Sequence, residues 1–286
     1  MAGMNIGAVL QQLDGLFRRG EYARIEPFML EAVAAADAAR DKGAMLALLN
    51  ELMGYYRSLS RGADSLRVAR RALGLVEELG LQGSVQHATT LLNVATAYRA
   101  DGQIDTAIAQ FAEAGRMLDA LPVSDPRLRA TLHNNLSLAW QEAGAHDKAL
   151  AELEQALPLV RTRADGEVDA AVTLTNMALS RLRLGQLVRA RDELFEAMAL
   201  FERQPQLSGH YSAALAGLAE VAYREGRLQD AVGYYERALA DIEARHGRNM
   251  HYVITLESLA LACETLDPQR AGSLTGQARA IRATLV

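Results

Sequence analysis

The sequence predicts an all-α solenoid, an array of about seven antiparallel helix pairs that follow one another along the chain. Three observations predict it: a pattern that recurs at a fixed interval, a glycine at the same place in most copies, and a composition rich in Ala and Leu. Aromatic residues make up only 5% of the 286 residues and Pro totals 6, which favours helices over strands. An array of helices is therefore expected from end to end.

The repeat is clearest in four segments that begin with Gly and reach Ala five residues later. They are Gly102–Ala107, Gly144–Ala149, Gly185–Ala190 and Gly226–Ala231, so that successive glycines lie 42, 41 and 41 residues apart. A second alanine follows in each copy, at Ala114, Ala156, Ala197 and Ala238. Glycine can adopt the positive φ that ends one helix, and small alanines let the second helix pack closely on the first.

Weaker copies extend the array to both ends, with Gly20, Ser60 and Asp267 at the turn position. A second pattern, seen in Thr90–Ala95 and Thr173–Ala178, precedes the turns and marks a first helix in each copy. We therefore expect one domain over residues 1–286, with a helix pair in each of residues 4–39, 40–82, 83–124, 125–165, 166–207, 208–248 and 249–286.

These features resemble the tetratricopeptide-repeat family, in the longer variant found in kinesin light chain and many bacterial proteins. The resemblance covers nearly the whole chain, although Arg181 stands where an aromatic residue is usual. It implies a right-handed superhelix whose concave groove is lined by the first helix of each pair. It also implies a protein-protein interaction adaptor, or scaffold, that binds an extended peptide or protein segment in that groove.

Three asparagines point to the predicted groove, because Asn93, Asn135 and Asn176 each lie nine residues before a turn glycine. Stacked repeats place such residues in a ladder, and an amide can both donate to and accept from a peptide backbone. Hydrogen bonding between neighbouring helices is the alternative explanation. The full set predicted to line the groove is Asn50, Glu51, Arg57, Asn93, Thr96, Arg99, Asn134, Asn135, Gln141, Asn176, Arg183, His210, Glu220, Tyr223 and Arg224.

Within this set, the arginines can pair with ligand carboxylates or phosphates, although solvated arginines are common on protein surfaces. Tyr223 is expected to anchor a ligand, and His210 to line one end of the groove. The carboxylate clamp by which some family members hold chaperone tails is not supported, because the matching positions hold Leu92, Thr89 and Thr131.

Composition and motifs exclude several classes of function. The net charge of -5 arises from 30 basic and 35 acidic residues spread along the chain, which argues against nucleic acid as a partner. No signal peptide or long apolar run is found, and a single cysteine fits a reducing compartment, so a cytoplasmic protein without membrane contact is expected. No catalytic, metal-binding or phosphate-binding motif is found, so neither enzyme activity nor a cofactor is expected.

The identity of the partner stays open. The alternative function is a ligand- or peptide-responsive regulatory sensor that acts through a separate effector protein. Homo-oligomer formation through the final repeat is a further prediction, because Ala280, Ile281, Leu285 and Val286 end the chain without an obvious polar cap.

Overall fold

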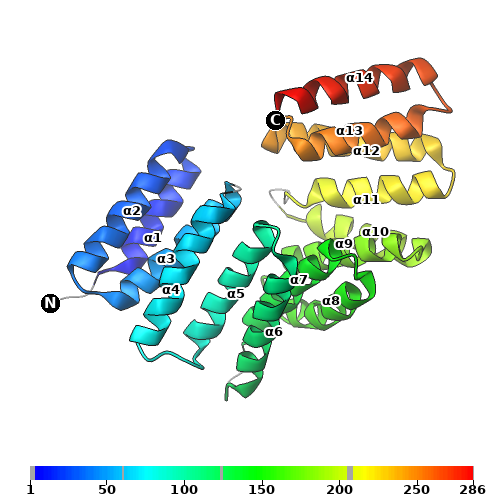
Figure 1. Ribbon diagram of the computed structural model, residues 1–286. Coiled ribbons are helices and arrows are strands. Elements are labelled where there is room, and N and C mark those ends of the chain that lie inside the picture. The colour runs from blue at the N-terminus through cyan, green and yellow to red at the C-terminus, as the bar shows by residue number, and fades with distance from the viewer. Residues whose placement is uncertain (1–3, 60, 123–124, 205–208, 286) are drawn as a thin grey trace. The chain divides into compact units, whose positions relative to one another are not determined.

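The computed structural model describes residues 4–59, 61–122, 125–204 and 209–285, and Ser60 and Val286 lie outside these ranges. The described chain holds fourteen α-helices and no strand, which confirms the all-α prediction (Figure 1). Each predicted repeat contains one helix pair. The pairs are α1 (Ile6–Arg18) and α2 (Tyr22–Ala38), α3 (Lys42–Ser58) and α4 (Gly62–Glu78), α5 (Val85–Ala100) and α6 (Ile104–Ala120), α7 (Pro126–Glu142) and α8 (His146–Arg161), α9 (Glu167–Arg183) and α10 (Leu187–Phe201), α11 (Tyr211–Arg224) and α12 (Leu228–His246), and α13 (Met250–Cys263) and α14 (Pro268–Thr284).

The turn glycines have the backbone conformation that the repeat pattern predicts. Gly102 has φ 78°, and Gly144, Gly185 and Gly226 have φ between 73° and 76°. Beside Gly102, the backbone N–H of the next residue donates to the carbonyl oxygen of Tyr98 at 2.9 Å, which satisfies a carbonyl at the end of α5. Glycine is therefore the residue that ends the first helix without steric strain.

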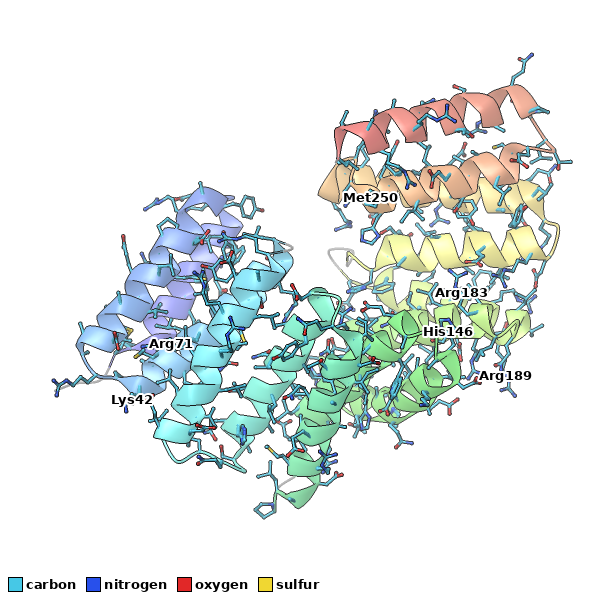
Figure 2. All side chains as sticks on the ribbon, in the orientation of Figure 1. Lys42, Arg71, His146, Arg183, Arg189 and Met250 are labelled. Atoms are coloured by element: carbon cyan, nitrogen blue, oxygen red, sulfur yellow. The ribbon has the colours of Figure 1, made fainter. Side chains whose placement is uncertain are left out.

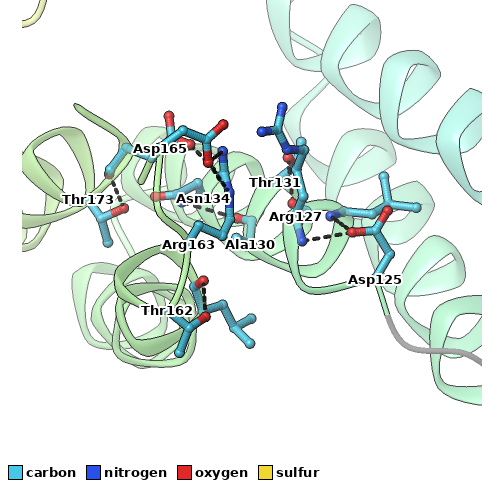
Figure 3. A network of polar contacts seen from close by, with 12 residues as sticks. Asp125, Arg127, Ala130, Thr131, Asn134, Thr162, Arg163, Asp165 and Thr173 are labelled. Carbon is cyan, nitrogen blue, oxygen red and sulfur yellow. Dashed lines mark hydrogen bonds and ion pairs between the residues drawn. The ribbon is translucent and has the colours of Figure 1, made fainter. Parts of the chain in front are cut away.

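Several helices begin at a side chain that accepts backbone hydrogen bonds. Asp125 Oδ1 accepts from the N–H groups of Arg127 and Leu128 at 2.9 and 3.2 Å, ahead of Pro126 (Figure 3). Asp267 likewise accepts from Arg270 N at 3.0 Å. Asp267 replaces the turn glycine because here the second helix starts with a capping acid followed by proline.

The paired alanines form the closest part of the packing between helices, as the sequence predicts. All of them are fully buried: Ala107, Ala114, Ala149, Ala156, Ala190, Ala197, Ala231 and Ala238. Larger apolar side chains fill the space around them, among them Tyr56, Phe111 and Phe201. Because alanine adds only a methyl group, the second helices can pack closely on the first.

Arg181 is buried, and its charge is met by side chains of its own repeat and of the preceding one. Its side chain is 7% exposed, and its guanidinium donates to Glu193 at 2.7 Å, to Gln186 at 2.7 Å and to Glu154 at 3.3 Å. Burial raises the pKa of Glu193, while Arg181 acts in the opposite direction. An ion-pair cluster thus occupies the place of the usual aromatic residue.

The chain forms two compact units, residues 1–143 and residues 144–286, which are described separately. In the first unit, α1, α3, α5 and α7 contact one another in succession, and in the second unit α9 contacts α11. We call the surface formed by these first helices of the pairs, together with α13 in the second unit, the first-helix face of each unit. The predicted groove residues lie on these helices or at their ends.

Candidate partner-binding site

A hydrogen bond between two predicted ligand-binding asparagines connects neighbouring repeats in the first unit. Asn93 Nδ2 in α5 donates to Asn50 Oδ1 in α3 at 2.7 Å. Asn50 Nδ2 in turn donates to Leu46 O at 2.9 Å and to Thr90 Oγ1 at 3.3 Å. This part of the ladder therefore joins helices, which is the structural role that the sequence left as an alternative.

The other asparagines of the set differ in their surroundings. Asn135 Nδ2 donates to Thr131 O at 3.0 Å and Asn134 Nδ2 to Ala130 O at 3.1 Å, both within α7. Asn176 in the second unit is only 9% exposed. Thr96 is also buried, and its hydroxyl donates to Leu92 O at 2.7 Å. Asn176 and Thr96 therefore present little surface to a partner.

Two arginines occupy equivalent positions near the ends of α3 and α5. Arg99 is 19% exposed and forms an ion pair with Glu142 of α7. Arg57 Nη1 and Arg99 Nε are buried without a hydrogen-bond partner. Burial lowers the pKa of Arg57, and the like charge of Arg99 lowers it further. This end of the first-helix face thus holds two cations and one carboxylate, beside the half-buried Gln141.

Glu51 lies next to the asparagine pair, on the same turn of α3 as Asn50. Although part of Glu51 is exposed, removal of water from its carboxyl raises its pKa, and the negative charge of Asp14 raises it further. The first-helix face of the first unit is thus polar, with acidic groups around Glu51 and basic groups around Arg57.

The predicted charged residues of the second unit pair with one another. Glu220 forms an ion pair with Arg224 one turn away on α11. Arg183 of α9, labelled in Figure 2, lies 3.8 Å from the same carboxylate. Arg224 Nη1 also donates to Leu182 O at 2.8 Å. In contrast to Arg57, Arg224 therefore donates to both a carboxylate and a backbone carbonyl of its own unit.

A cavity of about 540 Å³ opens on the first-helix face of the second unit, beside the N-terminal ends of α11 and α13. Its apolar lining comes from Leu179 of α9, Ala213 and Ala216 of α11, Ile242 of α12 and Ile254 of α13. Ile254 is 52% exposed, which is high for isoleucine. The volume is within the range of sites that hold small ligands or side chains.

The polar side chains in the cavity wall are largely engaged by their own helices. Ser212 and Thr255 donate to Gly209 O and His251 O at 3.4 and 2.9 Å, and Asn249 Oδ1 accepts from Tyr252 N at 3.0 Å. The cavity therefore offers mainly aliphatic surface to a ligand, together with the imidazoles of His210 and His251.

His210 lines the cavity from the start of α11, where the sequence predicted a groove end. Parts of this residue are exposed, yet the cavity wall removes enough water from its imidazole to lower its pKa. Neutral imidazole is therefore favoured at neutral pH. Tyr223, expected as an anchor, instead packs partly against the core between α11, α12 and α13.

Sequence reasoning missed Leu179, Ile254 and His251. Leu179 lies six residues before Gly185, the same offset at which Thr96 precedes Gly102, and Ile254 lies thirteen before Asp267. The repeat offset indicates the first-helix face for Leu179, but Ile254 and His251 lie further from the turn, near the start of α13. Leu179 and Ile254 are aliphatic, and they carry no polar signal for a binding site.

Neither a metal site nor a membrane span is found in the described ranges. No group of three or more His, Cys, Asp or Glu side chains there is arranged to hold a metal ion. None of the described helices is both long and apolar enough to cross a membrane. Cys263 is buried in α13, which raises the pKa of its thiol.

No known protein-family profile matches the chain. The chain is similar in structure to a STAND signal-transduction ATPase with a tetratricopeptide repeat sensor from Pyrococcus horikoshii, with a TM-score of 0.66 and 13% identity over 96% of this chain and 41% of that one. The chain has the tetratricopeptide-repeat fold. This agrees with the repeat pattern in the sequence and with a helix pair in each of the seven predicted ranges.

Two further proteins are similar to this tetratricopeptide-repeat chain. NprR, solved in complex with its cognate peptide NprX, has a TM-score of 0.59 and 16% identity over 92% of this chain and 74% of that one. The Photosystem I assembly protein Ycf3 of Prochlorococcus marinus (strain NATL1A) is 25% identical over 138 residues, which are 48% of this chain and 76% of Ycf3.

Proposed function

We propose that this tetratricopeptide-repeat protein is an interaction scaffold that binds a peptide or an extended protein segment on its first-helix faces. The cavity of the second unit is the observation that carries the proposal. It collects aliphatic side chains from three first helices at the surface, while its polar side chains already bond to their own backbone. Such a cavity suits an apolar side chain of the bound segment.

The first-helix face of the first unit is polar, and it suits the backbone of a bound segment. Asn135 and Asn93 each use one amide N–H within the protein, and neither amide oxygen accepts a hydrogen bond from the described residues. An extended backbone has an N–H that such an oxygen can accept, regardless of side-chain sequence. Backbone contacts of this kind would hold a segment on the first unit, and the cavity would hold an apolar side chain on the second.

The comparisons support binding rather than catalysis as the class of function. NprR was solved with a peptide, and Ycf3 is named for the assembly of a protein complex. Both are similar to this chain at 16% and 25% identity, which supports a class of function and no particular ligand. The regulatory sensor stays a prediction, as does the cytoplasmic location.

Filling the cavity tests the proposal. Peptides selected from a phage-displayed library on the wild-type protein serve as probes, and fluorescence anisotropy gives their affinities. The substitution Ala213→Trp places an indole in the cavity, so we expect affinity to fall by about tenfold or more, as for the loss of a central contact.

The matched control is Ala240→Trp, which adds the same side chain at an exposed position of α12. This variant should bind the peptides as the wild type does, and both variants should melt close to the wild-type temperature. Equal affinities in all three proteins, or a library that yields no binding peptide, would contradict the proposal.

A further inference from the structure

Arg57 and Arg99 each keep one buried guanidinium nitrogen without an acceptor, although Arg99 also pairs with Glu142. This nitrogen is Nη1 in Arg57 and Nε in Arg99. Arg57 forms no ion pair with a described carboxylate, and burial lowers its pKa, as does the like charge of Arg99. A buried donor without an acceptor costs free energy, and the cost is greater for a charged group.

The guanidinium of Arg57 lies beside a residue that has no side chain. It folds back along α3, where Nη2 lies 3.9 Å from the place that a Cβ of residue 54 would take. Residue 54 is glycine, whereas the equivalent position of the next repeat holds Thr96. Since Arg57 is only half-buried, a change of side-chain rotamer can bring its donors to the surface.

The charges at this place do not cancel. Arg57 and Arg99 contribute two positive charges and Glu142 one negative charge, and Glu142 already pairs with Arg99. The corresponding cluster in the second unit also holds two arginines and one carboxylate, but there Arg224 donates both to Glu220 and to the carbonyl oxygen of Leu182. In the first unit, Arg57 Nη1 has no such acceptor among the described residues.

We propose that Arg57 and Arg99 form a subsite for one carboxylate of the bound segment, from an acidic side chain or from its C-terminus. A single carboxylate balances the excess positive charge, and its two oxygens match the fork of a guanidinium. The inference rests on the proposed function for the presence of a peptide on this face. The feature of the peptide that this subsite would recognise is a carboxylate.

Small carboxylates test the subsite without a peptide, by nuclear magnetic resonance of the arginine Nε–H groups. The probes are N-acetylglutamate N-methylamide for a side-chain carboxylate, N-acetylglycine for a terminal carboxylate, and N-acetylglutamine N-methylamide as the neutral isostere. Signals of Arg57 and Arg99 are assigned from Arg57→Gln and Arg99→Gln spectra. We expect saturable shifts of both signals with at least one carboxylate and none with the neutral amide.

The matched control is Arg67→Gln, which removes an exposed arginine of α4 that pairs with Asp64 on its own helix. It should leave the titration unchanged, whereas Arg57→Gln should abolish the shift of Arg99. Because Arg57 carries an unpaired buried donor, Arg57→Gln should melt no earlier than the wild type, which separates lost binding from lost folding. If it does melt earlier, Arg57→Lys, which keeps the charge but not the fork, should still weaken the shift of Arg99.

The outcomes separate this inference from the proposed function. Saturable carboxylate shifts at Arg57 support the subsite even if no library peptide binds, a result that would contradict the proposed function alone. Shifts that are absent with both carboxylates, or equal with the neutral amide, overturn the subsite. Peptide binding that Ala213→Trp abolishes would still stand in that case.

Discussion

Asn93 in α5 donates a hydrogen bond to Asn50 in α3 at 2.7 Å, which joins two repeats through side chains that the sequence pattern assigns to ligand binding. Both side chains are half-buried. In a variant that lacks the hydrogen bond, water therefore has only partial access to the group left without its partner. The pair therefore stabilises the stacking of repeats two and three, in addition to any contact that it makes with a partner.

Removing either asparagine should reveal a coupling between them. We expect a double-mutant cycle of Asn50→Ala and Asn93→Ala to give an interaction energy of about 1 kcal/mol, as for one partly buried hydrogen bond. Urea unfolding monitored by circular dichroism measures it. Asn135→Ala is the control, because the amide of Asn135 bonds only to its own helix in the described structure. This variant should lower the free energy of unfolding by less than Asn93→Ala does. A coupling near zero would show that the bond contributes nothing.

The fold was predictable because its signals are local and repeat. Gly102 and its equivalents need a positive φ, and Ala107 and its equivalents need to be small, so each copy confirms the others. Side-chain pairing follows no such rule. Asn93 bonds to Asn50 of the preceding repeat, whereas Asn135 at the equivalent position bonds within its own helix, because rotamers and neighbouring side chains differ between repeats that share a backbone.

The sequence predicted which charged residues lie on the first-helix face, but not which of them form ion pairs with one another. Arg57 and Arg224 have nearly the same offset from the turn, yet only Arg224 has a carboxylate one helical turn away. The cavity was not predicted, because Leu179 and Ile254 come from repeats far apart in the sequence and have no motif in common. Only the packed helices bring them to one wall.

A side chain at a turn glycine should lower stability because of the backbone conformation there, and not because it would contact neighbouring atoms. Gly102 has φ 78°, and a Cβ there would meet no atom within 4 Å. We therefore expect Gly102→Ala to lower the free energy of unfolding by about 1 kcal/mol, the cost of a left-handed conformation for an L-residue. Gly74 inside α4 also has free space, and Gly74→Ala should instead raise stability by about 0.5 kcal/mol through helix propensity. Thermal unfolding of the two variants should move in opposite directions.

Stability should depend on pH through Glu51. Its pKa in the folded protein is raised by burial and by Asp14, so its ionised form opposes folding. As pH falls through this raised pKa, the folded state binds the proton first and the penalty disappears. Glu51→Gln should therefore melt at a higher temperature than the wild type at pH 7, and the difference should vanish below about pH 4, where glutamate is protonated in both states. The exposed Glu31→Gln variant on α2 provides the control, and a pH-independent difference would rule out this explanation.

The cluster around Arg181 should be the most sensitive polar site in the second unit. Its side chain is 7% exposed and that of Glu193 is 15% exposed, so removal of the arginine leaves a carboxylate with little access to water. We expect Arg181→Ala to lower the free energy of unfolding by about 3 kcal/mol, the usual cost of breaking a buried ion pair. The double variant Arg181→Met, Glu193→Leu should recover most of that loss, because apolar side chains of similar size remove the unpaired charge. Chemical denaturation of the three proteins measures both effects. A single variant within about 0.5 kcal/mol of the wild type would mean that Arg181 behaves as an exposed ion pair, despite its burial.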